Sequence, residues 1–237
     1  GFFFAVASAI LLIALMNGLH IIAQQTSPSG TTYYVPTQFP TIQEAVNSPN
    51  VTDGDTIEVI PQDEPFSEDV VVHKSLTIRR YSKSSSTLKF AGSFTVKANG
   101  IEISNFTLQK PGSGILVSNC SNCHLERNII SNNTKGIYLQ NATGCTLIDN
   151  VLTDNTYNFG VYGTFLSHFL HNIDNTTNKI NGKPIQYLIN RSDLVINSTT
   201  FPNIGYLGVV NSANVTIQNL SFRNNTQGVL LAYTNNS

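Results

Sequence analysis

The chain has 237 residues, of which 13 are basic and 14 acidic, so its formal net charge is −1. Charged residues are 11% of the chain, whereas Asn, Ser and Thr together number 74; an ordinary soluble domain is about 25% charged. Such a surface of uncharged amides and hydroxyls excludes a nucleic-acid partner, which would need a basic field. The hydrophobic fraction of 41% excludes a disordered chain and is enough for one sizeable core.

An apolar segment opens the chain. Residues 2–16 are almost wholly apolar, which predicts a secretory signal peptide in residues 1–25 with Ala23 as the cleavage point. A membrane anchor is the alternative, because residues 2–22 are just long enough to span a bilayer. Either interpretation predicts an extracytoplasmic chain, secreted or anchored at the cell surface, that meets the membrane only through this segment. The chain lacks an initial Met and stops just after a predicted strand, so we expect both ends to be truncated.

Twelve Asn-x-Ser/Thr sequons agree with an exported glycoprotein, although a chain this rich in Asn, Ser and Thr also forms sequons by chance. Several of them fall in predicted turns, where Asn is common for conformational reasons. The sequon asparagines are Asn50, Asn105, Asn119, Asn132, Asn141, Asn175, Asn190, Asn197, Asn214, Asn219, Asn224 and Asn235.

An internal repeat of about 22 residues decides the fold class. Residues 123–128 align with 145–150, and residues 114–117 align with 136–139, both at an offset of 22. Each repeat holds short β-branched runs separated by turn residues, with no apolar stripe long enough for a crossover helix. These features predict an all-β parallel β-helix over residues 26–237. A leucine-rich solenoid is the alternative, but its dense Leu-x-x-Leu-x-Leu frame is missing.

One Asn recurs through the repeats and predicts a stacked column. Asn tolerates left-handed backbone angles, and its amide can hydrogen-bond the Asn of the coils above and below. The predicted members of this structural column are Asn105, Asn128, Asn150, Asn172, Asn197 and Asn219.

A short capping helix is predicted over residues 41–47, ahead of the first coil. Thr41 and Glu44 have the spacing of a capping box, in which each side chain bonds the backbone of the other. The open end of a solenoid has to be covered, so we expect this helix to plug the first coil. A strand over residues 56–60 is expected to follow.

The first coils and the Asn-rich repeats together resemble a known family. Residues 36–46, 53–59 and 70–78 look like the entry to many secreted right-handed β-helix proteins. The coils after them, with residues 180–190, resemble the NosD-type repeat family, and within it large secreted proteins of archaea. The resemblance covers roughly residues 33–237 and implies a right-handed, single-stranded β-helix. The family's architecture is shared with polysaccharide lyases and hydrolases, and its founding member is linked to copper delivery, but a fold alone does not carry function over.

Cys120, Cys123 and His124 form a Cys-x-x-Cys-His motif, the pattern of covalent haem attachment. Haem is disfavoured because the motif lies inside a repeat and His124 begins a strand. The same three residues are candidate copper ligands. The alternatives are that the cysteines pack in the core, or that Cys123 and Cys145, one coil apart, form a disulfide in an oxidising compartment. We expect no cofactor, with copper and haem as the alternatives.

Arg127, Asp149 and His171 each precede an Asn of the predicted column, and we expect them to reach solvent on successive coils. A base, a carboxylate and an imidazole in a row are candidates for acid–base catalysis. The alternative is a surface charge ladder of little energetic worth. Neighbouring outward acidic residues, which a calcium-assisted lyase needs, are missing from the sequence pattern. The sequence therefore leans against an enzyme, and a lyase or glycoside hydrolase is the alternative.

Tyr138 and Tyr162 are predicted to point outward on adjacent coils and to form an aromatic strip, with Gln186 further along. Aromatic faces suit sugar rings, and the resemblance implies that this sheet is the usual substrate face of the related lyases. The alternative is ordinary cross-strand packing.

The sequence thus predicts an exported cell-surface β-helix with a structural or adhesive role, whose partners are polysaccharides or other cell-envelope components. A polysaccharide-cleaving enzyme is the second interpretation, and a copper-handling extracytoplasmic protein is the third.

Overall fold

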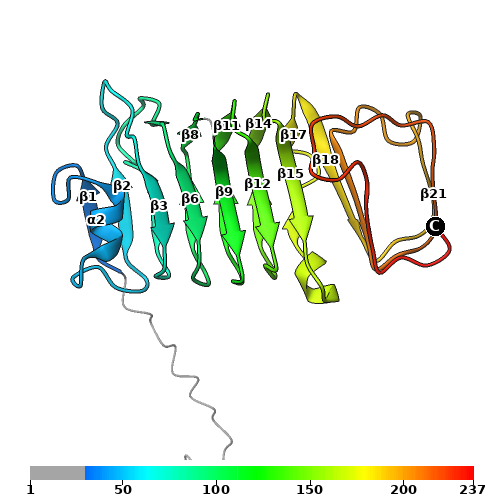
Figure 1. Ribbon diagram of the computed structural model, residues 1–237, viewed down its shortest axis with the longest axis horizontal. Coiled ribbons are helices and arrows are strands. Elements are labelled where there is room, and N and C mark those ends of the chain that lie inside the picture. Colours follow the sequence, from blue (N-terminus) through cyan, green and yellow to red (C-terminus); the bar gives the residue numbers. More distant parts are fainter. Residues whose placement is uncertain (1–29, 111) are drawn as a thin grey trace, which may run out of the picture.

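The computed structural model describes residues 30–110 and 112–237, in which the chain winds into coils stacked along one axis (Figure 1). Strands of neighbouring coils pair in parallel, and Ile137 lies opposite Ile115 and Phe159, each 22 residues away. The predicted all-β parallel β-helix is therefore confirmed. The predicted leader over residues 1–25 lies outside the described residues, and the domain boundary at residue 26 stays a prediction.

Three sheets form the walls of the stack, and the strands of each follow one another along the axis of the stack. The seven-stranded sheet contains β1 (Thr32–Val35), β2 (Thr56–Val59), β4 (Thr77–Arg80), β7 (Glu102–Ser104), β10 (His124–Glu126), β13 (Thr146–Ile148) and β16 (Asn172–Ile173). The five-stranded sheet contains β3 (Asp69–Val72), β6 (Ser93–Val96), β9 (Ser113–Ser118), β12 (Lys135–Gln140) and β15 (Tyr157–Tyr162). The eight-stranded sheet contains β5 (Lys89–Phe90), β8 (Thr107–Leu108), β11 (Ile129–Ser131), β14 (Val151–Thr153), β17 (Lys179–Ile180), β18 (Lys183–Ile189), β20 (Tyr206–Val210) and β22 (Leu230–Ala232). A separate pair joins β19 (Ser192–Ile196) to β21 (Ala213–Ile217).

The predicted capping helix is present as α2 (Ile42–Asn47) and lies at the N-terminal end of the stack (Figure 1). The Thr41 hydroxyl accepts the Glu44 N–H at 3.1 Å, which is the first of the two bonds of the predicted capping box. The Glu68 carboxylate, which sequence reasoning missed, accepts the N–H groups of the first two helical residues at 2.9 Å. No helix in the described residues has both the length and the apolar character to cross a bilayer.

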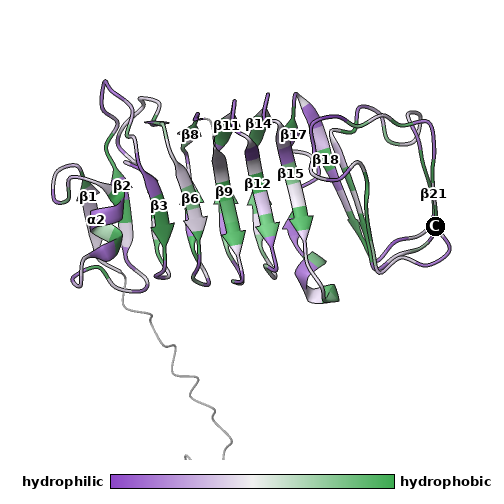
Figure 2. Cartoon of the chain, in the orientation of Figure 1, coloured by the Kyte–Doolittle hydropathy of each residue, from purple (hydrophilic) through white to green (hydrophobic). Residues whose placement is uncertain are grey.

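Apolar side chains fill the inside of the coils, while the turns between strands are mostly hydrophilic (Figure 2). Alternate residues along each strand face inward, as the period of a strand requires. The centre of the Phe94 ring, on β6, lies 5.0 Å from the centres of two other rings. Phe90 lies on β5, and Phe106 lies just before β8. Such stacks of large side chains join successive coils into one core.

A ladder of buried amides runs through Asn128, Asn150 and Asn178. The Asn150 Oδ1 accepts from both the backbone N–H and the side-chain Nδ2 of Asn128, at 3.2 and 3.1 Å. The Asn178 Oδ1 accepts in the same way from Asn150, at 3.0 and 2.9 Å. Each amide thus satisfies the backbone of the coil below it in the dry interior, where an unpaired polar group would be costly.

A second buried ladder, through Asn133, Asn155 and Asn158, was not predicted. The Asn155 Oδ1 accepts from the Asn133 N–H at 2.9 Å, and the Asn155 Nδ2 donates to the Asn158 Oδ1 at 2.9 Å. The 22-residue spacing of Asn133 and Asn155 was the signal in the sequence that could have revealed it.

The predicted column of asparagines is corrected in four of its six members. Asn105 sits one residue early, at the left-handed turn position (φ 65°) that Arg127 and Asp149 fill in the next coils. Asn219 is likewise a left-handed, exposed turn residue. Asn197 follows β19, and its side chain accepts the N–H groups of Thr199 and Thr200 in the turn after that strand. Members of the ladder follow the turn residue, whereas the prediction mixed the two positions.

The remaining error, at Asn172, has a different cause. Asn172 lies on the outer side of β16 opposite Thr146, which is 26 residues earlier. The coil that follows β15 is longer than 22 residues because it contains the 3₁₀ helix η1 (Leu166–Phe169). A constant period therefore misplaces every residue of this coil, and the true ladder member is Asn178.

Candidate functional site

Three outward tyrosines gather at the C-terminal edge of the five-stranded sheet, on β12 and β15. Tyr157 and Tyr162, on β15, are 44% and 54% exposed. Tyr138, on β12 of the coil before, is partly exposed. We call Tyr138, Tyr157 and Tyr162 the tyrosine face. The ammonium of Lys135 lies 4.5 Å from the centre of the Tyr138 ring, a cation–π contact.

The register of the strands corrects the predicted stacking of two tyrosines in one column. Tyr138 lies opposite Leu116 and Gly160, whereas Tyr162 lies opposite Gln140. The two rings are therefore diagonal neighbours. Partial burial raises the pKa of Tyr138, and the nearby Tyr162 adds to this shift. Tyr157, opposite Lys135, was missed by sequence reasoning, although its 22-residue offset from Lys135 marked it as an outward position.

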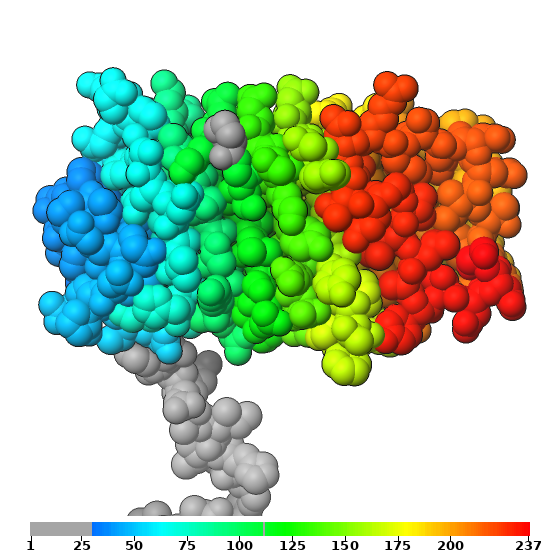
Figure 3. Space-filling model, in the orientation of Figure 1, coloured from blue at the N-terminus to red at the C-terminus, as the bar shows by residue number. Residues whose placement is uncertain are grey.

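Gly160 lies between Tyr157 and Tyr162 on β15, and Thr226 and the Tyr138 ring pack closely over it. A Cβ there would lie 2.9 Å from the Tyr138 ring and 2.5 Å from the Thr226 hydroxyl, so a side chain has no room. Residues 224–226 return from the C-terminal end and bond β15 through Asn158 N–H to Asn224 O and Thr226 N–H to Phe159 O. In Figure 3 the red C-terminal residues accordingly lie against the last green coils.

Gln186, the third predicted ligand residue, does not belong to the tyrosine face. It lies on β18 opposite Leu207, and β18 continues the eight-stranded sheet. The five-stranded sheet ends at β15. The prediction assumed that every repeat contributes a strand to every sheet, and the lengthened coil after β15 breaks that rule.

The predicted row of Arg127, Asp149 and His171 is only partly assembled. The Arg127 Nε lies 3.8 Å from the Asp149 Oδ2, and both side chains are more than half exposed. His171 is 4% exposed and faces the interior, so its predicted projection to solvent is wrong. Its Nδ1 accepts the Cys145 N–H at 3.2 Å and its Nε2 lies 3.0 Å from the His168 carbonyl.

Burial lowers the pKa of His171 to about 4, with the backbone bond to His168 opposing the effect. The imidazole is therefore neutral at neutral pH, and its Nε2 carries the proton that it donates to the carbonyl. His171 thus links the long coil to the coil before it, through the Cys145 N–H, and also bonds the His168 carbonyl within its own coil. The lengthening of that coil explains the error in its predicted position.

The Cys-x-x-Cys-His motif is split between the two sides of the coil wall. Cys120 and Cys123 face the interior, and their sulfur atoms lie 3.7 Å apart. His124 faces outward and contacts the Glu126 carboxylate at 3.1 Å. These three side chains do not converge on one point, so they do not fit haem or a shared copper ion. Within residues 30–110 and 112–237, no group of three His, Cys, Asp or Glu side chains has the arrangement of a metal site.

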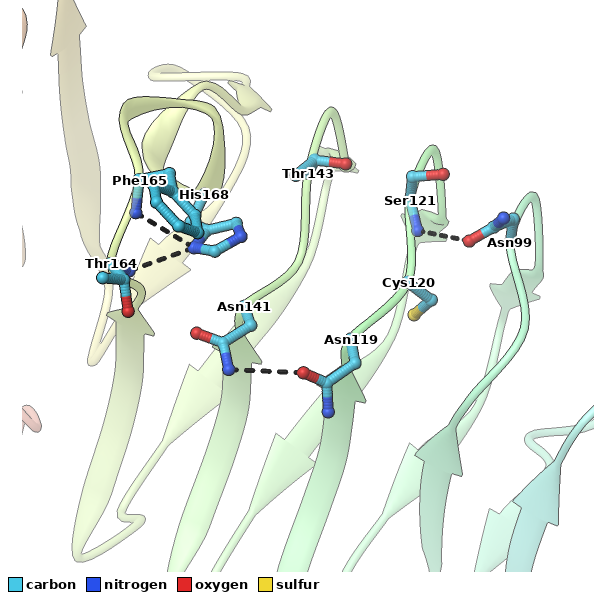
Figure 4. Close-up of a pocket in the computed structure, with 9 residues that line it drawn as sticks. All are labelled: Asn99, Asn119, Cys120, Ser121, Asn141, Thr143, Thr164, Phe165 and His168. Carbon is cyan, nitrogen blue, oxygen red and sulfur yellow. Dashed lines mark hydrogen bonds between the residues drawn. The ribbon is translucent and has the colours of Figure 1, made fainter.

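A polar hollow of about 420 Å³ lies along the turns that join the five-stranded and seven-stranded sheets (Figure 4). Its floor is built from turn residues of three coils, and η1 with the exposed Phe165 forms its end wall. The Asn141 Nδ2 donates to the Asn119 Oδ1 at 3.3 Å, and the His168 Nδ1 accepts the N–H groups of Thr164 and Phe165. Cys120 opens onto this hollow (Figure 4).

The architecture is that of a parallel β-helix with few charged side chains, and the tyrosine face lies on the outside of its five-stranded sheet. The model of the right-handed β-helix region matches residues 92–237, and the chain therefore belongs to the right-handed β-helix family. This match supports the fold that the sequence resemblance implied, and NosD-type membership stays a prediction.

The chain is also similar to a cell surface glycoprotein of Methanothermus fervidus. The two are 35% identical over 98 residues, which are 40% of this chain and 16% of that protein. The chain thus covers a small part of that relative's length. No solved structure matches the chain.

Proposed function

We propose that this chain is a segment of an extracytoplasmic surface protein in which the β-helix is a structural and adhesive element. The similarity to a cell surface glycoprotein supports the location. The observation that carries the structural role is the hydrogen bonding between successive coils, in which two buried amide ladders accompany the sheet hydrogen bonds of the regular coils. A solenoid bonded in this way keeps its length and projects whatever is attached to its ends.

The tyrosine face is the proposed contact with polysaccharide. Its exposed rings offer apolar surfaces for sugar rings, and Lys135 and Gln140 beside them supply hydrogen-bond donors. Gly160 has no side chain, so the Tyr138 ring packs directly against the backbone of β15. The lining favours a neutral or weakly acidic polymer.

Two alternatives from the sequence, polysaccharide cleavage and copper handling, find less support in the geometry. The Arg127–Asp149 pair lacks its predicted imidazole, since His171 is buried. The two thiols and His124 of the proposed copper site point to opposite sides of the coil wall.

Affinity electrophoresis tests the polysaccharide contact. The chain is run in gels cast with a panel of neutral and acidic polysaccharides, beside a Tyr138→Ala/Tyr162→Ala variant and a Tyr81→Ala control from another part of the wall. We expect retardation that the double variant loses and the control keeps. Equal retardation of all three proteins would contradict the tyrosine face, and clearing of the polymer would favour the enzyme.

The surface location is tested separately. An antibody against the chain should label intact cells that carry the protein as strongly as it labels permeabilised cells. Labelling only after permeabilisation would contradict the location, whatever the gels show.

A further inference from the structure

Cys120 and Cys123 lie in a four-residue turn between β9 and β10, and neighbouring coils hold this turn in place. The Ser121 N–H donates to the Asn99 Oδ1 at 2.8 Å, and the Asn122 N–H donates to the Thr143 carbonyl at 2.9 Å. The Cys120 carbonyl accepts the Thr143 N–H at 3.0 Å. The backbone between the two cysteines is therefore fixed from both sides before any bond forms between them.

Both thiols point into the coil, with their sulfur atoms 3.7 Å apart. A disulfide has an S–S distance of about 2.05 Å, so closing the pair takes a movement of about 1.6 Å. We infer that Cys120 and Cys123 form an intramolecular disulfide under oxidising conditions and leave Cys145 as a free thiol. The surface location under "Proposed function" would supply those conditions.

The alternative pair, Cys123 and Cys145, is disfavoured by strand geometry. The residues that follow them, His124 and Thr146, lie in register on β10 and β13. In-register neighbours on parallel strands have parallel Cβ bonds about 4.8 Å apart, whereas a disulfide holds its Cβ atoms about 3.8 Å apart. Bridging Cys123 and Cys145 would therefore distort two coils, whereas bridging Cys120 and Cys123 changes one turn.

Access to the pair runs through Cys120. It is 5% exposed and lines the polar hollow, whereas Cys123 and Cys145 are fully buried (Figure 4). Oxidation by a small disulfide such as oxidised glutathione therefore begins there. The Cys120 sulfur attacks the oxidant, losing its proton and releasing one thiol. The Cys123 sulfur then attacks Cys120, loses its proton and releases the second thiol. Two protein thiols and one small disulfide give one protein disulfide and two small thiols.

Hydrogen bonding to Cys120 and to Cys145 lowers the pKa of Cys123, which suits it to the second attack. The hydrogen bond between Cys120 and Cys123, together with burial, raises the pKa of Cys120. The first exchange is therefore expected to be slower than at an exposed cysteine.

The test uses the purified chain incubated with oxidised glutathione, alkylated in denaturant and digested with trypsin without reduction. Cys120 and Cys123 share the tryptic peptide 98–127, and Cys145 lies on 136–179. We expect peptide 98–127 to lose two hydrogen atoms and to resist alkylation, while Cys145 is alkylated. A peptide cross-linked to 136–179, stable glutathione adducts or three alkylated thiols would each overturn the inference.

Two variants make the result specific. Cys145→Ser keeps the pair and should close as the wild type does, whereas Cys120→Ser should leave Cys123 reduced. Thermal unfolding of both variants shows that they are folded. Acid quenching of intact cells, followed by alkylation in denaturant, then separates the two proposals. A pair that closes when purified but is reduced in the cell counts against the surface location, not against the pairing.

Discussion

The coils between β9 and β14 and the coils between β18 and β22 have nearly the same period but different interiors. In the first region the three strands of a coil meet their partners at one offset, 22 residues, and two amide ladders cross the interior. In the second region β18 and β20 pair at 21 residues. Among the described residues from 179 onward, Ser212 is the only buried polar side chain apart from tyrosines.

The C-terminal coils are stabilised instead by apolar contacts on both faces of β20. Every residue of β20 is buried, with Tyr206 and Val210 in the main core and Leu207 and Val209 in a second apolar cluster. The strands of the regular coils, by contrast, alternate between inner and outer residues. Buried amides therefore link the coils of the first region and extend across the longer coil to Asn178, whereas the C-terminal coils rely on apolar area, which tolerates a shift in register.

Removal of a ladder amide should break the first region far more than the second. In Asn150→Ala, the Asn128 amide and backbone N–H lose their acceptor, and the Leu125 carbonyl loses a donor. Each buried group left unpaired costs about 1–3 kcal/mol, so we expect a loss of about 4 kcal/mol in the free energy of unfolding, measured in urea.

Ser212→Ala is the matched change in the C-terminal coils. It removes a buried hydroxyl that bonds the Arg191 N–H and the Val210 carbonyl, and should cost about 1 kcal/mol. Equal losses in the two variants would mean that the ladder does not distinguish the regions.

The junction between the regions should respond to pH through His171. Its pKa is about 4 in the folded chain and about 6.5 when unfolded, so the unfolded chain binds the proton more tightly. The stabilisation is complete above pH 6.5 and is lost as the pH falls to 4. Integrated over that window, it amounts to about 3 kcal/mol.

His171→Asn keeps an acceptor for the Cys145 N–H and cannot titrate, so urea unfolding at pH 7 and pH 4.5 should show a flatter dependence than in the wild type. His73→Asn is the control, since His73 is exposed. A wild type and His171→Asn with the same slope between these pH values would assign the acid sensitivity to other groups.

The sequence was sufficient to predict the regular coils, because their spacing of 22 residues is visible in Cys123 and Cys145 and in Gly114 and Gly136. It also predicted the cap at Thr41, where the interaction is local. Extending that spacing past β15 misplaced His171, Asn172 and Gln186, whereas Asn105 was misplaced within the regular coils because the turn position was confused with the ladder position. The length of a coil depends on how η1 packs, and no local pattern fixes it.

The site was less predictable than the fold. The outward direction of Tyr138 and Tyr162 followed from alternation along a strand, but their diagonal relation depends on register. The closing contact of residues 224–226 with β15 joins segments 66 residues apart in sequence, as in the Asn158–Asn224 bond. Such a contact leaves no periodic signal, because it occurs once.

The smallest effect is expected at the surface charges of the regular coils. Arg127 and Asp149 are more than half exposed, and Glu126 also engages Arg127, at 2.9 Å. Because both residues have positive φ, alanine would add backbone strain, so Asn, which already fills this turn position at Asn105, is the better replacement. In a double-mutant cycle of Arg127→Asn and Asp149→Asn, the coupling energy should stay below about 0.5 kcal/mol and fall further in salt, because water screens exposed ion pairs. A coupling above about 2 kcal/mol would show that the wall charges, and not the buried amides, hold these coils in register.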